Sequence, residues 1–286
     1  MKRRDSESPH FFAGRVFEEL NITDMQGLLI GEDGKFTVAL EAFEVEADEA
    51  VKIFGLLSPG EAEKKVELAT RVGVPFALVV HREGLEKIFL YYLGWTEPRR
   101  LGILGNESLS EEEFLQWWAQ NKQTRQVKNY NEIRSRMKDS YFDHLLESHG
   151  QKWGGNVDGV MYADSRIPVI TGIIEKRITD KMSLANYDPA NFFNYRGGDY
   201  HTWLPVYNLA RMLNVPLYLF TFQQRNDTQV GITIVDSMSK EGIHYIKNSR
   251  GGEIRPCDNI FEDFDKMKEW ILEQRSQNFG NGENAQ

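Results

Sequence analysis

Apolar and polar positions in the first half of the chain predict helices and strands in alternation. Gln26–Gly31 and Lys35–Val45 predict two strands around an Asp-Gly turn, a pair typical of hairpins. Pro75–Val80 is a continuous apolar run, which indicates a strand buried on both faces. The other elements predicted in this half are a helix at 11–20, a helix from Pro59, a strand at 87–93 and a helix from Ser110.

The second half shows a similar alternation. Polar residues at 121–128 indicate a boundary, and an amphipathic helix is predicted from about Val127 to His149. The later elements predicted are strands at Val157–Tyr162 and Pro168–Glu175, a helix at His201–Leu213, strands at Pro216–Phe222, Gln229–Val235 and Ile243–Lys247, and a helix from Phe261 to about Glu273. We therefore expect an α/β fold of two αβα modules with mixed central sheets, over residues 1–125 and 126–275, and a disordered tail at 276–286.

Two stretches of the chain resemble each other. Leu68–Leu78 (LATRVGVPFAL) and Leu209–Leu219 (LARMLNVPLYL) are identical at five of eleven positions. Upstream, Asp24 precedes Glu41 by 17 residues, and Asp158 precedes Glu175 by 17 residues. A helix, a Val-Pro turn and a strand are common in α/β proteins, so chance likeness stays open. Two copies of one module would place their strands in the same order.

Asp158 and Glu175 suggest metal chemistry. Asp158 begins one predicted strand, and Glu175 closes the next one after a turn at Asp164–Arg166. Adjacent strands lie about 4.8 Å apart, so the hairpin can bring both carboxylates to one edge. Such a pair predicts a site for Mg²⁺ or Mn²⁺, at which water and a substrate phosphate complete the coordination. The plainer alternative is a turn at Asp158 and a solvated strand end at Glu175.

These two acids, with the helix and strand that follow, resemble the PD-(D/E)XK nuclease superfamily over residues 127–250. That family carries an Asp at the start of one strand, an acid-X-Lys triplet on the next, and a helical crossover back into the same sheet. The resemblance implies a restriction-endonuclease-like domain that hydrolyses phosphodiester bonds in DNA with a divalent metal. Asp158 and Glu175 would then hold the metal.

The chain departs from this family at the lysine. Arg177 stands two residues after Glu175, with Lys176 between them, so Lys176, Arg177 and Lys181 are all candidates for the missing role. Strand side chains alternate, so Lys176 faces away from Glu175 unless the strand bulges. The resemblance also makes Glu147, near the end of the preceding helix, a candidate member of the catalytic site.

The first half lacks the basic residue of the family triplet. Glu41 is followed by Ala42 and Phe43, so this half would be a degenerate, inactive copy. Its 22 acidic and 15 basic residues over positions 1–125 give a net charge of −7, which suits a protein partner better than DNA.

Composition limits the partners further. The chain of 286 residues carries a net charge of −9, which argues against a general polyanion binder and favours local basic contacts to DNA, with single-stranded DNA as one alternative. Lys128, Arg134, Arg136 and Lys138 are candidates for such contacts, or form a solvated helix face. One cysteine excludes an internal disulfide, and no apolar run reaches the roughly 20 residues of a membrane span. We expect a cytoplasmic protein and leave its oligomeric state open.

The function predicted from the sequence is therefore a magnesium-dependent nuclease acting on DNA. The missing lysine and the negative charge favour one alternative, a catalytically degenerate nuclease fold that serves as a binding or scaffold module. A nucleotide-sensing module in the first half is a further alternative, although that half has no Gly-rich phosphate loop.

Overall fold

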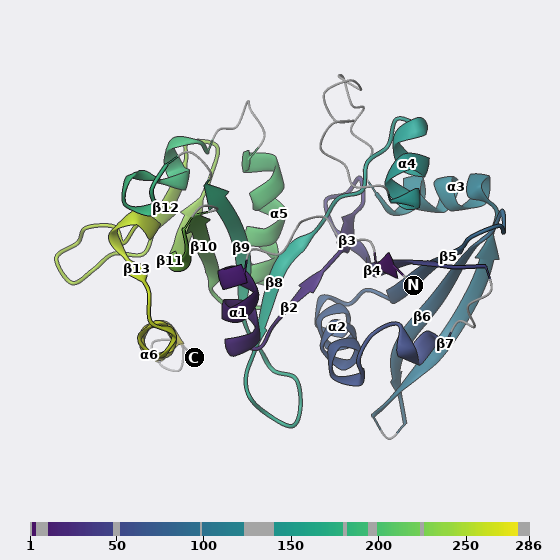
Figure 1. Cartoon of the computed structure of the whole chain (residues 1–286), viewed down its shortest axis with the longest axis horizontal. Coiled ribbons are helices and arrows are strands. Elements are labelled where there is room, and N and C mark those ends of the chain that lie inside the picture. The colour runs from purple at the N-terminus through teal and green to yellow at the C-terminus, as the bar shows by residue number, and fades with distance from the viewer. Residues whose placement is uncertain are drawn as a thin grey trace. The chain divides into compact units, whose positions relative to one another are not determined.

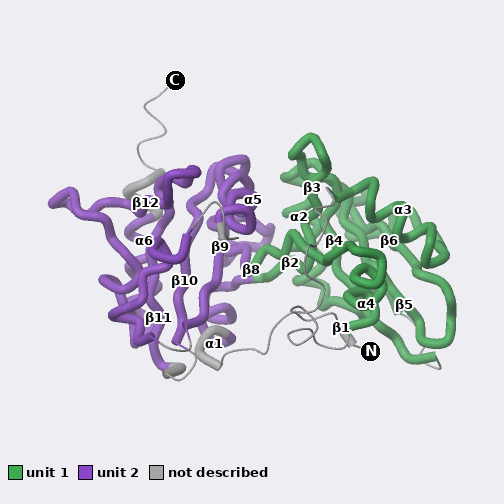
Figure 2. Tube along the Cα trace, turned by 90° about the horizontal axis from the view of Figure 1, so that it is seen from above, with its two compact units in different colours: residues 1–8, 23–158 green, residues 9–22, 159–286 purple. Residues whose placement is uncertain are grey.

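The computed structural model describes residues 2–3, 11–47, 52–97, 99–122, 140–179, 182–193, 199–223 and 226–279 (Figure 1). They form two compact α/β units with mixed β-sheets, as the sequence predicted. Unit 1 contains Met1–Ser8 and Thr23–Asp158, and unit 2 contains Pro9–Ile22 and Gly159–Gln286 (Figure 2). The main division falls at Asp158, later than the boundary near residue 125 that the sequence favoured. Among the described residues, no helix is both long and apolar enough to cross a membrane.

Unit 1 is built on a sheet with the strand order β1-β4-β5-β6-β7, in which β3 also pairs with β4. Its strands are β1 (Lys2–Arg3), β3 (Gly27–Ile30), β4 (Phe36–Val45), β5 (Phe76–Arg82), β6 (Ile88–Thr96) and β7 (Arg100–Leu109). Its helices are η1 (Ile53–Gly55), α2 (Pro59–Val72), α3 (Glu111–Asn121) and α4 (Tyr141–Ser148). Strand β7 was not predicted, because this edge strand is largely exposed and carries no buried apolar face.

Helices cover both faces of this sheet. Leu40 and Ala42 of β4 pack with α3 and α4 in a core that includes Trp118 and Phe142. Side chains alternate along a strand, so Glu41 and Phe43 point to the opposite face, where α2 lies. The sheet of unit 1 is therefore a middle layer between α2 and the pair α3 and α4.

The long helix predicted from Val127 to His149 is shorter in the structure. Ser140 is extended, with φ −101° and ψ 127°, so α4 begins only at Tyr141. Residues 127–139, with the basic face expected on them, lie outside the described residues. The prediction was wrong at Ser140 because its apolar spacing continued through a residue whose backbone is not helical.

The second sheet has the strand order β12-β11-β10-β9-β8-β2, in which β13 also pairs with β11. Its strands are β2 (Ile22–Met25), β8 (Val157–Tyr162), β9 (Ile170–Thr179), β10 (Leu217–Gln223), β11 (Asn226–Met238), β12 (Ile243–Tyr245) and β13 (Ile260–Phe261). The helices of unit 2 are α1 (Phe11–Glu19), η2 (Leu184–Asn186), η3 (Pro189–Asn191), α5 (Asp199–Met212), η4 (Pro256–Asp258) and α6 (Phe264–Phe279). Helix α6 extends into the expected tail, of which 280–286 lie outside the described residues.

Each unit includes a helix from the other half of the chain. Helix α1 precedes β3 in sequence, yet its Val16 packs in unit 2 with Phe220 of β10 and Met267 of α6. Helix α4 precedes β8 in sequence, yet its Phe142 packs in the core of unit 1. The two helices are thus exchanged between the halves of the chain.

Both units share one four-strand core. In unit 1, β3 and β4 are antiparallel, β4 and β5 are parallel, and β5 and β6 are antiparallel. In unit 2, β8, β9, β10 and β11 repeat these directions in the same order. The strand order expected of a duplicated module is thereby confirmed.

The loops that enter the parallel strands also match. Val74 N donates to Ala69 O at 3.0 Å at the end of α2, and Val215 N donates to Ala210 O at 3.0 Å at the end of α5. The intervening residues Gly73 and Asn214 both have positive φ, of 78° and 53°, which glycine and asparagine accept more readily than other residues. The likeness of the two segments thus extends to individual hydrogen bonds, which favours duplication over chance.

Candidate functional site

The register of the parallel strands places one glutamate at the same position in both units. Glu41 of β4 lies opposite Leu78 of β5, and Glu175 of β9 lies opposite Leu219 of β10. Leu78 and Leu219 are also the last, aligned residues of the two similar segments. The sequence likeness and the strand register therefore agree that Glu41 and Glu175 are equivalent. Both glutamates point to the face that carries the crossover helix.

The position equivalent to Asp158 is Gln26, not Asp24. Gly27 pairs with Leu40 and Gly159 pairs with Ile174, so the residues before the two glycines correspond. The loops that connect the paired strands differ in length. The loop between β3 and β4 covers residues 31–35, and the loop between β8 and β9 covers residues 163–169. The equal spacing of the acids in the two halves is therefore a coincidence of sequence.

In the β8–β9 hairpin, the register brings the two predicted metal ligands together. Gly159 of β8 is paired with Ile174 of β9. Because the two strands are antiparallel, Asp158, which precedes Gly159, lies opposite Glu175, which follows Ile174. Asp158 is half-buried and Glu175 is 6% exposed. Directly opposed residues share one face of a sheet, so both carboxylates lie on the same side. Two carboxylates suit Mg²⁺, which keeps several water ligands; no group of three or more acidic, His or Cys ligands occurs among the described residues.

Arg177 and Lys176 lie on opposite faces of β9. The pairing of β9 with β10 is continuous from Ile173 to Thr179, so no bulge turns Lys176 toward Glu175. The Arg177 guanidinium lies on the face of Glu175, with Cζ 4.4 Å from the ring centroid of Trp203 in α5. Lys176 Nζ lies 5.9 Å from the ring centroid of Phe17 in α1.

Two further residues, Glu147 and Lys181, were predicted as candidates for this site. Glu147 lies on α4 (Tyr141–Ser148), a helix of unit 1. Lys181 lies outside the described residues.

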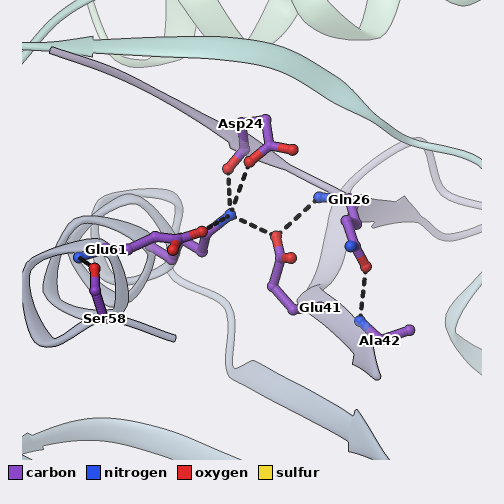
Figure 3. Close-up of polar contacts among 7 residues, drawn as sticks. Asp24, Gln26, Glu41, Ala42, Ser58 and Glu61 are labelled. Atoms are coloured by element: carbon purple, nitrogen blue, oxygen red, sulfur yellow. Dashed lines mark hydrogen bonds and ion pairs between the residues drawn. The ribbon is translucent and has the colours of Figure 1, made fainter. Parts of the chain in front are cut away.

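In unit 1, a buried lysine faces Glu41. Lys65 Nζ, on α2, lies 2.6 Å from Glu41 Oε1 and 3.2 Å from Asp24 Oδ1, and it donates to the backbone oxygen of Asp24 at 2.5 Å (Figure 3). Glu61 Oε1 is 3.4 Å from the same ammonium. The Lys65 side chain is 1% exposed and that of Glu41 is 0% exposed, so both charges are removed from water and stabilised by each other.

Gln26 completes the enclosure of Glu41. Its backbone N–H donates to Glu41 Oε1 at 3.0 Å, and its side-chain oxygen accepts a hydrogen bond from Ala42 N at 2.8 Å (Figure 3). An amide thus stands where β8 carries the Asp158 carboxylate. The strand triplet of unit 1 lacks a basic residue, as the sequence showed, but α2 supplies one from outside the triplet.

The position equivalent to Lys65 in unit 2 is apolar. Lys65 stands three residues before Leu68, and Val206 stands three residues before the matching Leu209. Val206 is buried at 4% exposure, so α5 brings no ammonium to Glu175 at this place. The two units therefore differ in the group that faces the shared glutamate.

Sequence reasoning missed Lys65, although the pattern held a signal. Lys65 lies on the apolar face of α2, between Ala62 and Leu68, both of which are buried. A charged residue on such a face requires a buried partner.

A second polar cluster marks the end of β5. The His81 ring stacks on Tyr141 of α4, with ring centroids 3.4 Å apart. Burial lowers the pKa of His81, against the opposing effect of Glu44 and Glu111. Tyr141 donates its hydroxyl to Glu111 Oε1 at 2.5 Å, and burial together with this bond raises the pKa of Tyr141. The cluster joins α3, α4 and the sheet within unit 1.

Comparisons with models of protein families, with curated proteins and with solved structures find no match for this chain.

Proposed function

We propose that the β8–β9 hairpin holds Mg²⁺ or Mn²⁺ through Asp158 and Glu175, and that the protein hydrolyses phosphodiester bonds in DNA. The observation that supports this is the opposition of Asp158 and Glu175 in the strand register, with Arg177 on the same face of β9. The bound metal would polarise the phosphate and activate a water molecule.

Arg177 would stabilise the negative charge that develops on the phosphate. A guanidinium stays protonated, so Arg177 donates hydrogen bonds to oxygens but does not accept a proton from water. Trp203 would hold this guanidinium in place, since Arg177 Cζ lies 4.4 Å from its ring centroid. The crossover from β9 through α5 to the parallel strand β10 also supports the proposal, because the family resemblance implies this order.

Unit 1 would be a non-catalytic copy. The glutamate shared by the two units is closed off there by Lys65 and Gln26. The Lys65 ammonium already occupies the position between Glu41 and Asp24 that a metal ion would need. This unit would support the fold or bind a protein partner, to which its acidity contributes.

A second candidate function is a binding or scaffold module that has lost catalysis. Arg177 at the position of the family lysine favours it, because a guanidinium stays protonated and cannot accept a proton from water. The net charge of −9 favours it as well.

A cleavage assay with matched variants tests the proposal. The full chain is incubated with supercoiled plasmid and with single-stranded DNA, in Mg²⁺, in Mn²⁺ and in a chelator. We expect metal-dependent cleavage that Asp158→Asn and Glu175→Gln each reduce at least about 100-fold. Glu269→Gln removes an exposed carboxylate of α6 and should leave cleavage unchanged. Cleavage that persists in Glu175→Gln would contradict the site, and an inactive wild type would favour the scaffold.

A further inference from the structure

A cavity of about 360 Å³ lies in unit 1. It is bounded by η1, the first turns of α2, and the strands β5, β6 and β7. Its apolar lining includes Leu57, Leu78, Leu93 and Leu101. The size is at the small end of ligand pockets, and the mostly apolar wall is typical of them.

Arg99 is held firmly at the mouth of this cavity. It connects β6 to β7 with φ 61°, a left-handed conformation that costs a non-glycine residue energy. Its guanidinium donates to Glu67 Oε2 at 3.0 Å and lies 5.3 Å from the ring centroid of Trp95. The ion pair with Glu67 and the contact with Trp95 therefore hold one cationic group beside the apolar wall.

The charge at the mouth is positive within an acidic unit. Glu67 is shared between Arg99 and Arg71, whose Nε donates to it at 2.9 Å. Arg100 also lines the cavity and forms no ion pair with any other residue that the structure describes. The charged residues that line the cavity are Arg99, Arg100 and Glu63, which together leave one net positive charge.

The N-terminus of α2 adds to this field. The helix begins at Pro59, which lines the cavity, and the helix dipole favours an anion near its first turn. Phe54 stands at the rim with 53% of its surface exposed, so an apolar group extends the wall outward.

We propose that this cavity binds a small anionic amphiphile, with its single apolar chain against the leucines and its anionic head between Arg99 and Arg100. A planar guanidinium pairs with a carboxylate or a phosphate through two parallel hydrogen bonds. Such a ligand would contact the apolar wall with its chain and pair with the arginines through its head. A neutral apolar molecule would leave Arg100 without an anion. This site is separate from the proposed nuclease site and does not depend on it.

Calorimetric titration with matched probes tests the proposal. Decanoate and decyl phosphate, kept below their micelle concentrations, should bind the full chain at one saturable site, and their relative affinities identify the preferred head. Decanol should bind at least about tenfold more weakly, because a charge-assisted hydrogen bond is lost. Decyltrimethylammonium should not bind. Equal affinity for decanol and decanoate, or no saturable binding of either anion, would overturn the proposal.

Two variants locate the binding site without disturbing the core. Arg100→Ala should weaken decanoate binding about tenfold, and Phe54→Ala should weaken decanoate and decanol alike, because Phe54 contributes only apolar contact. Arg250→Ala removes an exposed arginine from unit 2 and should have no effect. Undiminished binding by both Arg100→Ala and Phe54→Ala would contradict this assignment. Asp158→Asn, which should abolish cleavage, should leave decanoate binding intact, so the two proposals can fail separately.

Discussion

Lys65 and Glu41 form an ion pair in the interior of unit 1, with Nζ 2.6 Å from Oε1. The helix position equivalent to Lys65 is the buried Val206 in unit 2. This helix residue therefore differs between the two copies beside the glutamate position that they share.

Lys65→Met should lower the free energy of unfolding by about 3–5 kcal/mol, because it leaves the Glu41 carboxylate buried without its cation. Urea denaturation measures this change. The double variant Glu41→Gln/Lys65→Met should be at least about 1 kcal/mol more stable than Lys65→Met alone, since the unpaired charge is gone. Lys64→Met, at the next position of α2, is the matched control and should change stability by less than about 1 kcal/mol. Strictly additive effects of the two substitutions would show that the pair is not coupled.

Arg177→Lys should keep or increase cleavage, because a lysine ammonium reaches a phosphate oxygen and a water as a compact donor. Arg177→Ala should reduce cleavage about 100-fold. Lys176→Ala should have little effect, since Lys176 lies on the other face of β9. Rates on plasmid DNA in Mg²⁺ measure all three. A severe loss in Lys176→Ala with a normal Arg177→Ala would reverse the two roles, and an inactive wild type that Arg177→Lys does not activate would favour the scaffold function.

Asp158→Asn should keep or raise the melting temperature in the absence of metal, because it relieves repulsion from the neighbouring Glu175 carboxylate. Added Mg²⁺ should raise the melting temperature of the wild type, as a ligand that binds only the folded state does. The same addition should leave the variant unchanged. Differential scanning calorimetry with and without Mg²⁺ makes the comparison. Equal stabilisation of both proteins by Mg²⁺ would place the bound ion elsewhere.

His81 should make stability fall as pH falls below neutrality. Burial lowers its pKa in the folded protein, so the unfolded chain, with a histidine pKa of about 6.5, takes up the proton first. The contribution of neutral His81 is full above that pH and is lost as the pH falls from there toward the folded pKa. His81→Phe keeps a ring against Tyr141 but cannot titrate. Between about pH 7.5 and pH 5.5, the variant should lose less unfolding free energy than the wild type; equal losses would contradict this role.

A fragment of residues 1–125 should not fold. It lacks α4, so Trp118 and Phe114, both 0% exposed in the whole chain, would lose the packing of Phe142. We expect it to bind a hydrophobic dye strongly and to lack a cooperative melting transition. Mixing it with a fragment of residues 126–286 should restore the transition. A fragment 1–125 that melts cooperatively by itself would show that the core of unit 1 does not require α4.

The sequence predicted the repeated order of strands because that order depends on local signals. The Val-Pro turns, the apolar runs and the Asp-Gly hairpin each determine a short segment. The pairing of Asp158 with Glu175 in register followed from a second hairpin, predicted from the turn at Asp164–Arg166. The wrong equivalence of Asp24 with Asp158 arose because spacing along a chain ignores the length of the connecting loop.

Other features depended on contacts far apart in sequence. Lys65 reaches Glu41 across 24 residues, and only the packing of α2 on β4 brings them together. The local sequence of α1 and α4 does not indicate which unit each helix packs in, since each helix has an ordinary apolar stripe. The left-handed backbone at Arg99 is likewise set by the β6–β7 turn rather than by residue preference.

The exchange of α1 and α4 also bears on how such a chain can change over generations. A deletion that removed either half would take away a helix that the other half needs for its own core. Mutations can therefore silence the chemistry of one copy, but recombination cannot discard that copy without unfolding its neighbour. Unit 1 would be retained for this reason even if, as we propose, Lys65 occupies the place of a metal ion beside its glutamate.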